Sequence, residues 1–367
     1  MEIKESGVLE NWSDGMMGEA EKHAGRPAGR HGRAMAGFTL IEFLVAIAMA
    51  MVIMAALFRT FKVQQDSYVI QDQVSAMQQN LRAAMYLITR DLQMAGFYTN
   101  FDGTNITMDW NADGADETGR PLIFARNDIT ATGDGIRDGT DEIVIVKASR
   151  EEGRFLEDGE GASGISLSLS DWNLGGSPED DLKVSRNDAN GTTGKMYGIL
   201  VKNDLSRAEL FQLSGSNLTR SLAESYTGQP DDGNPSTPNL SDRIHRADII
   251  IYRIDDSTPA RPCLVRRNLG SDNGFQVIAE HIENLQFRYL LSNGAWTTNL
   301  TGNQNFVRAV EVFLVARTAN PQRGYRDTST YTFGSGTTAY TFTPAGDDRN
   351  YRRRVLTALV KTRNIGL

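Results

Sequence analysis

The chain lacks most of the residue patterns that enzymes and nucleic-acid-binding proteins use. It has one cysteine, Cys263, among 367 residues, so no intramolecular disulfide can form, and this residue is expected to be a small buried apolar group. Beyond residue 37 the only histidines are His245 and His281, which do not form a metal-spaced pair. No G-x-S-x-G elbow occurs, so the sequence predicts no enzyme. The formal net charge of −8 argues against nucleic acid as a partner.

The residues that are present suit a globular protein with one unusual segment. A hydrophobic content of 40% is enough for a real core. Gly, Asn, Asp, Ser and Thr crowd the middle of the chain, which is typical of short strands joined by turns. From Phe38 to Phe58 the residues are apolar or small, interrupted only by Thr39 and Glu42. A helix of this length spans the hydrocarbon core of a bilayer, roughly 30 Å.

The charges before this run predict its orientation. Four basic residues, and no acidic ones, lie between residues 22 and 37: Lys22, Arg26, Arg30 and Arg33. The positive-inside rule places this leader in the cytoplasm and the rest of the chain across the membrane. A cleaved secretory signal fits less well, because the apolar run is too long and its small residues precede it.

The segment Gly37-Phe38-Thr39-Leu40-Ile41-Glu42 resembles the processing motif of type IV prepilins and pseudopilins. The resemblance implies that a membrane prepilin peptidase removes residues 1–37 and methylates the new amino terminus at Phe38. It also implies an assembly role for Glu42, since a carboxylate buried in a neighbouring subunit can pair with that amine. The alternative is an acid that reaches the bilayer surface near a helix end. A start at Met16 or Met17 would shorten the leader.

Helical periodicity continues beyond the apolar run. One face of the predicted helix carries eight apolar residues at i, i+3, i+4 and i+7 spacing: Val74, Met77, Leu81, Ala84, Met85, Ile88, Leu92 and Ala95. The opposite face carries Asp72, Gln79, Arg82 and Arg90. No Pro or Gly interrupts residues 38–95, and Gly96 supplies the stop. The pattern predicts one helix of roughly 58 residues whose amphipathic second half packs on a head domain.

The remainder of the sequence predicts strands. These are Glu142–Ala148, Ile165–Ser170, Met196–Lys202, Glu209–Leu213, Asp248–Ile254, Cys263–Asn268, Ile282–Leu291, Ala309–Arg317 and Tyr351–Thr362. Connections rich in Gly, Asp, Asn and Pro are expected at 100–120, 149–164, 228–241 and 320–350. Residues 150–245 either belong to the head or form a distinct insertion.

Three C-terminal segments resemble the PilW family of minor pilins: "HIENLQFRYLLSNG" (281–294), "VRAVEVFLVART" (307–318) and "YRRRVLTALVKTRN" (351–364). The segment "DGTDEIVIV" (138–146) resembles the family's first long strand. The fold expected is α+β and pilin-like, with a leader (1–37), an assembly helix (38–96) and a large antiparallel β-rich head (97–367). The basic run 352–354 is expected to be the alternating or edge portion of the last strand.

By this resemblance the chain is a type IV pilus assembly protein, a minor pilin of low abundance at the pilus tip or in the priming complex. The expected partners are the prepilin peptidase, other major and minor pilins, the inner-membrane assembly platform and, before assembly, the lipid bilayer. The head lies in the periplasm first and on the cell surface afterwards. A J-type minor pseudopilin of type II secretion is an alternative, and so is a membrane-anchored calcium-dependent adhesin.

One acidic loop is a candidate calcium site, although no cofactor is required by the resemblance. Asp109, Asn111 and Asp113 stand at alternate positions before Gly114, like the opening of an EF-hand loop. The twelfth position is Arg120 instead of glutamate, so the segment is not an EF-hand. Its alternative is a solvated Asp/Gly turn, which is also the interpretation of "GDGIRDGTDE" (133–142).

Overall fold

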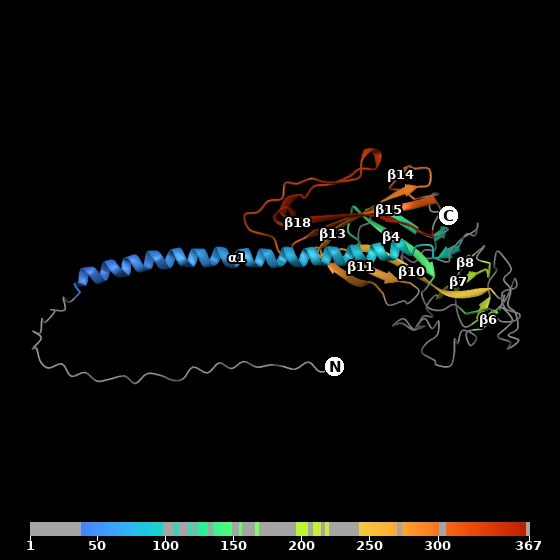
Figure 1. Ribbon diagram of the computed structural model, residues 1–367, viewed down its shortest axis with the longest axis horizontal. Coiled ribbons are helices and arrows are strands. Elements are labelled where there is room, and N and C mark those ends of the chain that lie inside the picture. The colour runs from blue at the N-terminus through green and yellow to red at the C-terminus, as the bar shows by residue number, and fades with distance from the viewer. Residues whose placement is uncertain are drawn as a thin grey trace, which may run out of the picture. The chain divides into compact units, whose positions relative to one another are not determined.

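The computed structural model describes the chain in segments: residues 38–97, 106–108, 117–119, 123–130, 135–148, 154–155, 166–168, 196–204, 208–213, 217–219, 242–269, 274–300 and 306–364. It contains one long helix, α1 (Leu40–Gln93), followed by a β-rich head (Figure 1). The chain divides into two compact units between Val63 and Gln64. The second half of α1 therefore belongs to the same unit as the head.

Both ends of α1 have local causes. At its start the backbone N–H of Glu42 donates to the hydroxyl of Thr39 at 3.3 Å, which caps the first turn. At its end Gly96 adopts φ +73°, a left-handed conformation that glycine tolerates best. The N–H of Gly96 then donates to the Val146 carbonyl at 2.9 Å, so the chain leaves the helix directly onto the head.

The head is built from eighteen strands and two short 3-10 helices in the described residues. The elements before residue 220 are β1 (Ile106–Met108), β2 (Glu117–Gly119), β3 (Ile123–Ile129), β4 (Thr140–Ala148), β5 (Arg154–Phe155), β6 (Ser166–Ser168), β7 (Met196–Val201), β8 (Ala208–Leu213) and β9 (Asn217–Thr219). Those after it are β10 (Arg243–Asp255), β11 (Cys263–Asn268), β12 (Gln276–Glu280), β13 (Ile282–Leu291), β14 (Trp296–Thr297), β15 (Val307–Arg317), β16 (Tyr331–Phe333), η2 (Gly336–Thr338), β17 (Tyr340–Phe342), η3 (Gly346–Asn350) and β18 (Arg353–Lys361).

Two antiparallel sheets form the body of the head. The larger has the order β12-β11-β10-β4-β3, with β5 and β7 pairing with the start of β10 and β8 pairing with β7. Residues 150–245 thus contribute strands to this sheet. The second sheet has the order β14-β13-β15-β18. Three two-stranded antiparallel sheets complete the described strands: β1-β2, β6-β9 and β16-β17.

The main core lies between α1 and the inner faces of both sheets. It combines Ile88 of α1, Ile145 of β4, Tyr252 of β10, Phe287 of β13 and Leu314 of β15, all of which are buried. A second cluster covers the opposite face of the larger sheet, around β4, β7 and β10. Every residue of β4 is buried, because this central strand has a packed layer on each face.

The sequence-based predictions of the strands are largely confirmed, with shifted ends. The predicted strand at residues 351–362 is β18, and that at 248–254 extends back to Arg243 as β10. The predicted connections at 100–120, 149–164 and 320–350 were wrong in part, since they contain β1, β2, β5, β16 and β17. Strands β3, β9, β12 and β14 were not predicted either.

Candidate functional site: the start of the helix and the polar clusters of the head

The first half of α1 exposes an apolar surface on all sides. Phe38 is 83% exposed and Leu40 79%, and large apolar side chains stay exposed as far as Val63. The segment contains a stretch long and apolar enough to cross a membrane, of which no part is buried within the protein. A core helix of a soluble protein would bury such a stretch. This half of α1 therefore needs surroundings that the described residues do not supply.

The predicted assembly residue stands at the start of this apolar surface. Glu42 is exposed, and in the described part of the chain no cation pairs with its carboxylate. Its backbone N–H is held by Thr39, so this threonine fixes where the helix begins. Phe38 precedes the helix. Gly37, on the other side of the predicted cleavage bond, lies outside the described residues.

The second half of α1 has the predicted amphipathic face. The residues predicted to pack on the head are buried or, at Val74, partly buried against the core. The four polar residues predicted to face away, Asp72, Gln79, Arg82 and Arg90, are all exposed. The helix prediction is therefore confirmed residue by residue, although α1 ends at Gln93.

A buried carboxylate that the sequence analysis did not single out anchors this face. The side chain of Asp91 is fully buried and bonds with three strands of the larger sheet. One carboxylate oxygen accepts from Lys147 Nζ of β4 at 3.0 Å. The other accepts from the Tyr252 hydroxyl of β10 at 2.7 Å and from Arg266 Nε of β11 at 3.1 Å. One helical residue thus ties α1 to three adjacent strands.

The surroundings of Asp91 stabilise its charged form. Burial by itself raises the pKa of this carboxyl, but the Tyr252 hydrogen bond and the charges of Lys147 and Arg266 outweigh it. The pKa of Asp91 therefore lies below its ordinary value. Burial and the Asp91 charge raise the pKa of the Tyr252 hydroxyl, which stays protonated as a donor. These groups form an ionic cluster in which both oxygens of Asp91 accept hydrogen bonds.

A second buried carboxylate, Asp141 of β4, joins the two sheets. Its oxygens accept backbone N–H groups from Asp128 of β3 at 2.8 Å and from Phe287 of β13 at 2.7 Å. No cation pairs with it in the described residues, and burial raises its pKa to about 7 despite these two bonds. The solvated turn expected at 133–142 is confirmed only at Asp138 and Gly139, because residues 140–142 belong to the buried strand β4.

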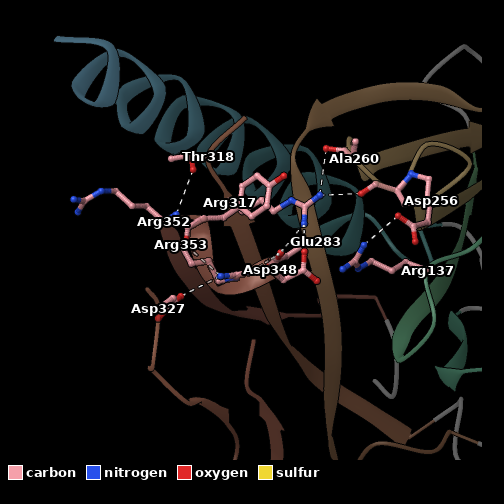
Figure 2. A network of polar contacts seen from close by, with 12 residues as sticks. Arg137, Asp256, Ala260, Glu283, Arg317, Thr318, Asp327, Asp348, Arg352 and Arg353 are labelled. Carbon is pink, nitrogen blue, oxygen red and sulfur yellow. Dashed lines mark hydrogen bonds and ion pairs between the residues drawn. The ribbon is translucent and has the colours of Figure 1, made fainter. Parts of the chain in front are cut away.

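Figure 2 shows a third cluster, on the outer face of the four-stranded sheet, centred on Glu283. Both Glu283 oxygens accept hydrogen bonds from the Arg353 guanidinium, and Arg317 Nη1 lies 3.7 Å from the carboxylate. Arg353 also bonds Asp327 at 3.2 Å, and Arg317 bonds Asp348 at 3.0 Å. Both aspartates belong to the excursion between β15 and β18. The ionic cluster therefore holds that excursion on the sheet.

A β-bulge places Glu283 in this cluster. The pairing of β13 with β15 moves from Ile282↔Ala316 to Asn284↔Val315, so Glu283 has no partner residue in the ladder. The preceding His281 adopts φ +60°. The extra residue turns the Glu283 side chain toward the ends of β15 and β18, where Arg317 and Arg353 pair directly.

The cluster also explains the basic run near the C-terminus. Arg353 is buried among its carboxylates, Arg354 is exposed, and Arg352 Nε donates to Gln322 at 2.6 Å. Arg353 and Arg354 therefore lie on opposite sides of β18, as predicted for the alternating portion of the last strand. The run is the start of an edge strand, because β18 pairs only with β15 in the described residues.

The remaining predicted site residues are the candidate calcium ligands and Cys263. Asp109, Asn111 and Asp113 lie outside the described residues, between β1 and β2, and the calcium loop stays a prediction. Among the residues that are described, no group of three His, Cys, Asp or Glu side chains is arranged to hold a metal. Cys263 is buried, as predicted, and its thiol donates to the Arg261 carbonyl at 3.2 Å.

Comparison with known proteins bears on this C-terminal region. Residues 251–364 match the sequence profile of the family described as Type IV Pilus-assembly protein W, or PilW. The chain resembles the PilW family. The matched PilW-like region contains Glu283, Arg317 and Arg353, so the three segments that carry the resemblance meet in one buried ionic cluster. This match relates the chain to type IV pili.

Two further comparisons add little. A type IV-like pilin from Thermus thermophilus is similar to the chain at 11% sequence identity, over 81% of this chain and 97% of that one, with a TM-score of 0.32. Comparison with curated proteins gives no match.

Proposed function

We propose that the chain is a minor pilin that enters a type IV pilus after a prepilin peptidase cleaves it between Gly37 and Phe38 and methylates Phe38. The head is then carried outside the inner membrane, first in the periplasm and later on the fibre. Its size favours low abundance and a position at the tip or in the priming complex, because a large head fits poorly in every turn of a packed fibre.

The exposed apolar half of α1 is the observation that carries this proposal. Its length suits a bilayer, and its exposure on all sides suits a bundle of similar helices equally well. Glu42 lies at the start of this surface with no cation of its own chain beside it in the described residues. A charge in an apolar environment is tolerated when it is paired, and the amine created at Phe38 by cleavage supplies the opposite charge.

Mass spectrometry of the protein isolated from its own cells tests the first step. The expected N-terminus is methylated Phe38. A chain that keeps residues before Phe38 contradicts the proposal. Replacing Gly37 by a bulkier residue is expected to leave the leader attached, while Ala36→Ser, one residue further from the bond, serves as the matched control.

Sheared fibres test the second step. Glu42→Ala is expected to be cleaved normally yet to be depleted from the fibre fraction, because the carboxylate that pairs with the neighbouring amine is gone. Glu42→Asp keeps the charge on a shorter side chain and is expected to be intermediate. Normal entry of Glu42→Ala into fibres would remove the charge-pairing argument while leaving the cleavage result intact.

A further inference from the structure

The outer edge of β18 is an open strand edge whose chemistry predicts a particular partner. Strand β18 is nine residues long and pairs in continuous register with β15 on one side. On its other side no strand of the described chain is present. Long open edges are rare in folded proteins, since they template pairing with another chain.

The hydrogen bonds that flank β18 show which of its residues face the open side. Thr318 N donates to the Arg352 carbonyl at 2.9 Å, and Thr362 N donates to the Arg308 carbonyl at 3.1 Å. Bonded and non-bonded pairs alternate in an antiparallel ladder, so the even-numbered residues of β18 bond with β15. The N–H and C=O groups of Val355, Thr357, Leu359 and Lys361 must therefore point away from β15.

The side chains along this edge are basic around an exposed apolar centre. Leu359 is 57% exposed, and Arg354, Lys361 and Arg363 are exposed. None of these three cations has an ion pair in the described part of the chain. Residues 351–367 include five basic and no acidic side chains, in a chain whose net charge is −8. Side chains alternate along a strand, so Leu359 and Lys361 share one face of the sheet while Arg354 lies on the opposite face. The edge is thus basic on both faces of the sheet, on an acidic protein.

We propose that the open edge of β18 binds an extended acidic segment of another polypeptide, which adds to the sheet as a further strand. Backbone groups of Val355 to Lys361 supply the hydrogen bonds, as in other cases of strand addition. The partner segment has an apolar residue beside Leu359, an acidic residue on the same face near Lys361 and an acidic residue on the opposite face near Arg354; the two cations are roughly 23 Å apart along the strand. This inference goes beyond the proposed function and does not depend on cleavage or on entry into a fibre.

A second copy of the same edge is a poor partner. Two β18 strands side by side would bring their basic side chains together, and like charges on neighbouring strands are destabilising. Basic side chains also protect edges against unwanted pairing. Protection alone does not account for a large apolar side chain left exposed between the cations.

Site-specific photo-crosslinking in cells that produce the full chain tests this proposal. A benzoyl-phenylalanine in place of Leu359 is expected to give an adduct whose mass spectrum identifies an extended, acidic segment of a different protein. The same group in place of Val277, which is 56% exposed on the edge strand β12, is the matched control. An adduct only with a second copy of this chain or with lipid, or a yield no higher than at residue 277, would overturn the proposal.

Charge reversals test whether the basic side chains of the edge contribute to binding. The triple reversal Arg354→Glu, Lys361→Glu and Arg363→Glu is expected to lower the adduct yield about tenfold. Lysines introduced into the captured acidic segment should then restore it. Reversing three exposed cations elsewhere, Arg82, Arg323 and Arg326, changes the net charge equally and is expected to leave the yield unchanged. Equal losses in both triple variants would contradict the proposal.

Thr357→Pro tests the backbone bonds. Proline removes an N–H that points away from β15, a position that edge strands tolerate, so the head should still fold. The adduct at residue 359 is expected to disappear, and an undiminished adduct would contradict strand addition. If the melting temperature shows that this variant does not fold, the charge reversals carry the test.

Discussion

The two halves of α1 belong to one continuous helix, but they differ in which side chains are exposed and which are buried. In the first half large apolar side chains such as Phe43 and Phe58 are exposed, at 61% and 69%. In the second half Ile88 and Leu92 are fully buried against two sheets, and Asp91 is buried with three partners. The helical backbone is continuous, but the first half is apolar on all sides and the second half on one face only, so the two halves need different surroundings. The head supplies them for the second half, and under the proposed function a membrane or other subunits supply them for the first.

The largest expected effect on stability comes from Asp91, the buried residue that anchors the second half of α1 to the head. Asp91→Ala is expected to lower the free energy of unfolding by about 3–5 kcal/mol, because it leaves the charges of Lys147 and Arg266 buried without their carboxylate. Chemical denaturation of the full chain in detergent micelles measures this loss. Arg90→Ala is the control, since Arg90 lies 3.8 Å from the same carboxylate with its side chain 47% exposed. A loss below about 1 kcal/mol, the range of exposed pairs, would mean that Asp91 does not anchor the helix.

The next largest loss of stability is expected when apolar packing in the second half of α1 is removed. Ile88 is fully buried between α1 and both sheets, so Ile88→Ala should cost about 3 kcal/mol through lost contacts and a cavity. Tyr86, two residues away and 66% exposed, is the control, and Tyr86→Ala should change stability by no more than about 0.5 kcal/mol. Similar losses in the two variants would show that the head does not distinguish the faces of α1.

A pH series sharpens the contrast between an anchored and an unpaired carboxylate. The pKa of Asp141 is raised from an ordinary value of 3.8 to about 7, so the folded state holds this proton over a range in which the unfolded state has lost it. Its contribution to stability therefore falls as the pH rises from about 4 to about 7 and is constant above that. Unfolding measured across this range should lose that slope in Asp141→Asn.

In the same pH series, the contribution of Asp91 to stability changes with pH in the opposite direction to that of Asp141. The pKa of Asp91 is lowered in the folded state, so its stabilising contribution is fully present above the ordinary pKa and is lost as the pH falls through the lowered one. Between pH 4 and 7 Asp91→Asn should keep the slope of the unaltered protein. If Asp141→Asn also keeps it, another group titrates in this range.

The sequence predicted the helix and most long strands because their patterns repeat. The buried face of α1 follows from spacing alone, and β10 follows from the apolar run "ADIIIYRI". Strand β3 was missed because Arg126 and Asp128 interrupt its alternation, and Asp128 adopts φ +53°. The short strands β16 and β17 lie in a Gly- and Thr-rich stretch that is typical of a loop.

The polar clusters were harder to predict for a different reason. A single aspartate on a helix is normally solvent-exposed, so only the positions of Lys147, Tyr252 and Arg266 in the folded head show why Asp91 is buried. Glu283 depends on a bulge, which no periodic pattern reveals. The sequence did mark the segments that contain Glu283, Arg317 and Arg353, by their resemblance to one family. What it could not show is that these segments meet.

The smallest expected effect lies at the very start of α1. Thr39→Ala removes the hydroxyl that accepts the Glu42 N–H, and the loss of such a cap costs about 1 kcal/mol of local helix stability. The first turn belongs to a different compact unit from the head, so denaturation of the head should be unchanged. Amide exchange at Glu42 should instead become about fivefold faster, which corresponds to that free energy. Thr39→Ser keeps the acceptor and should exchange like the unaltered chain. If Thr39→Ala instead shifted the unfolding of the head, the two halves of α1 would not be independent in stability. The contrast between an exposed first half and an anchored second half would then be wrong.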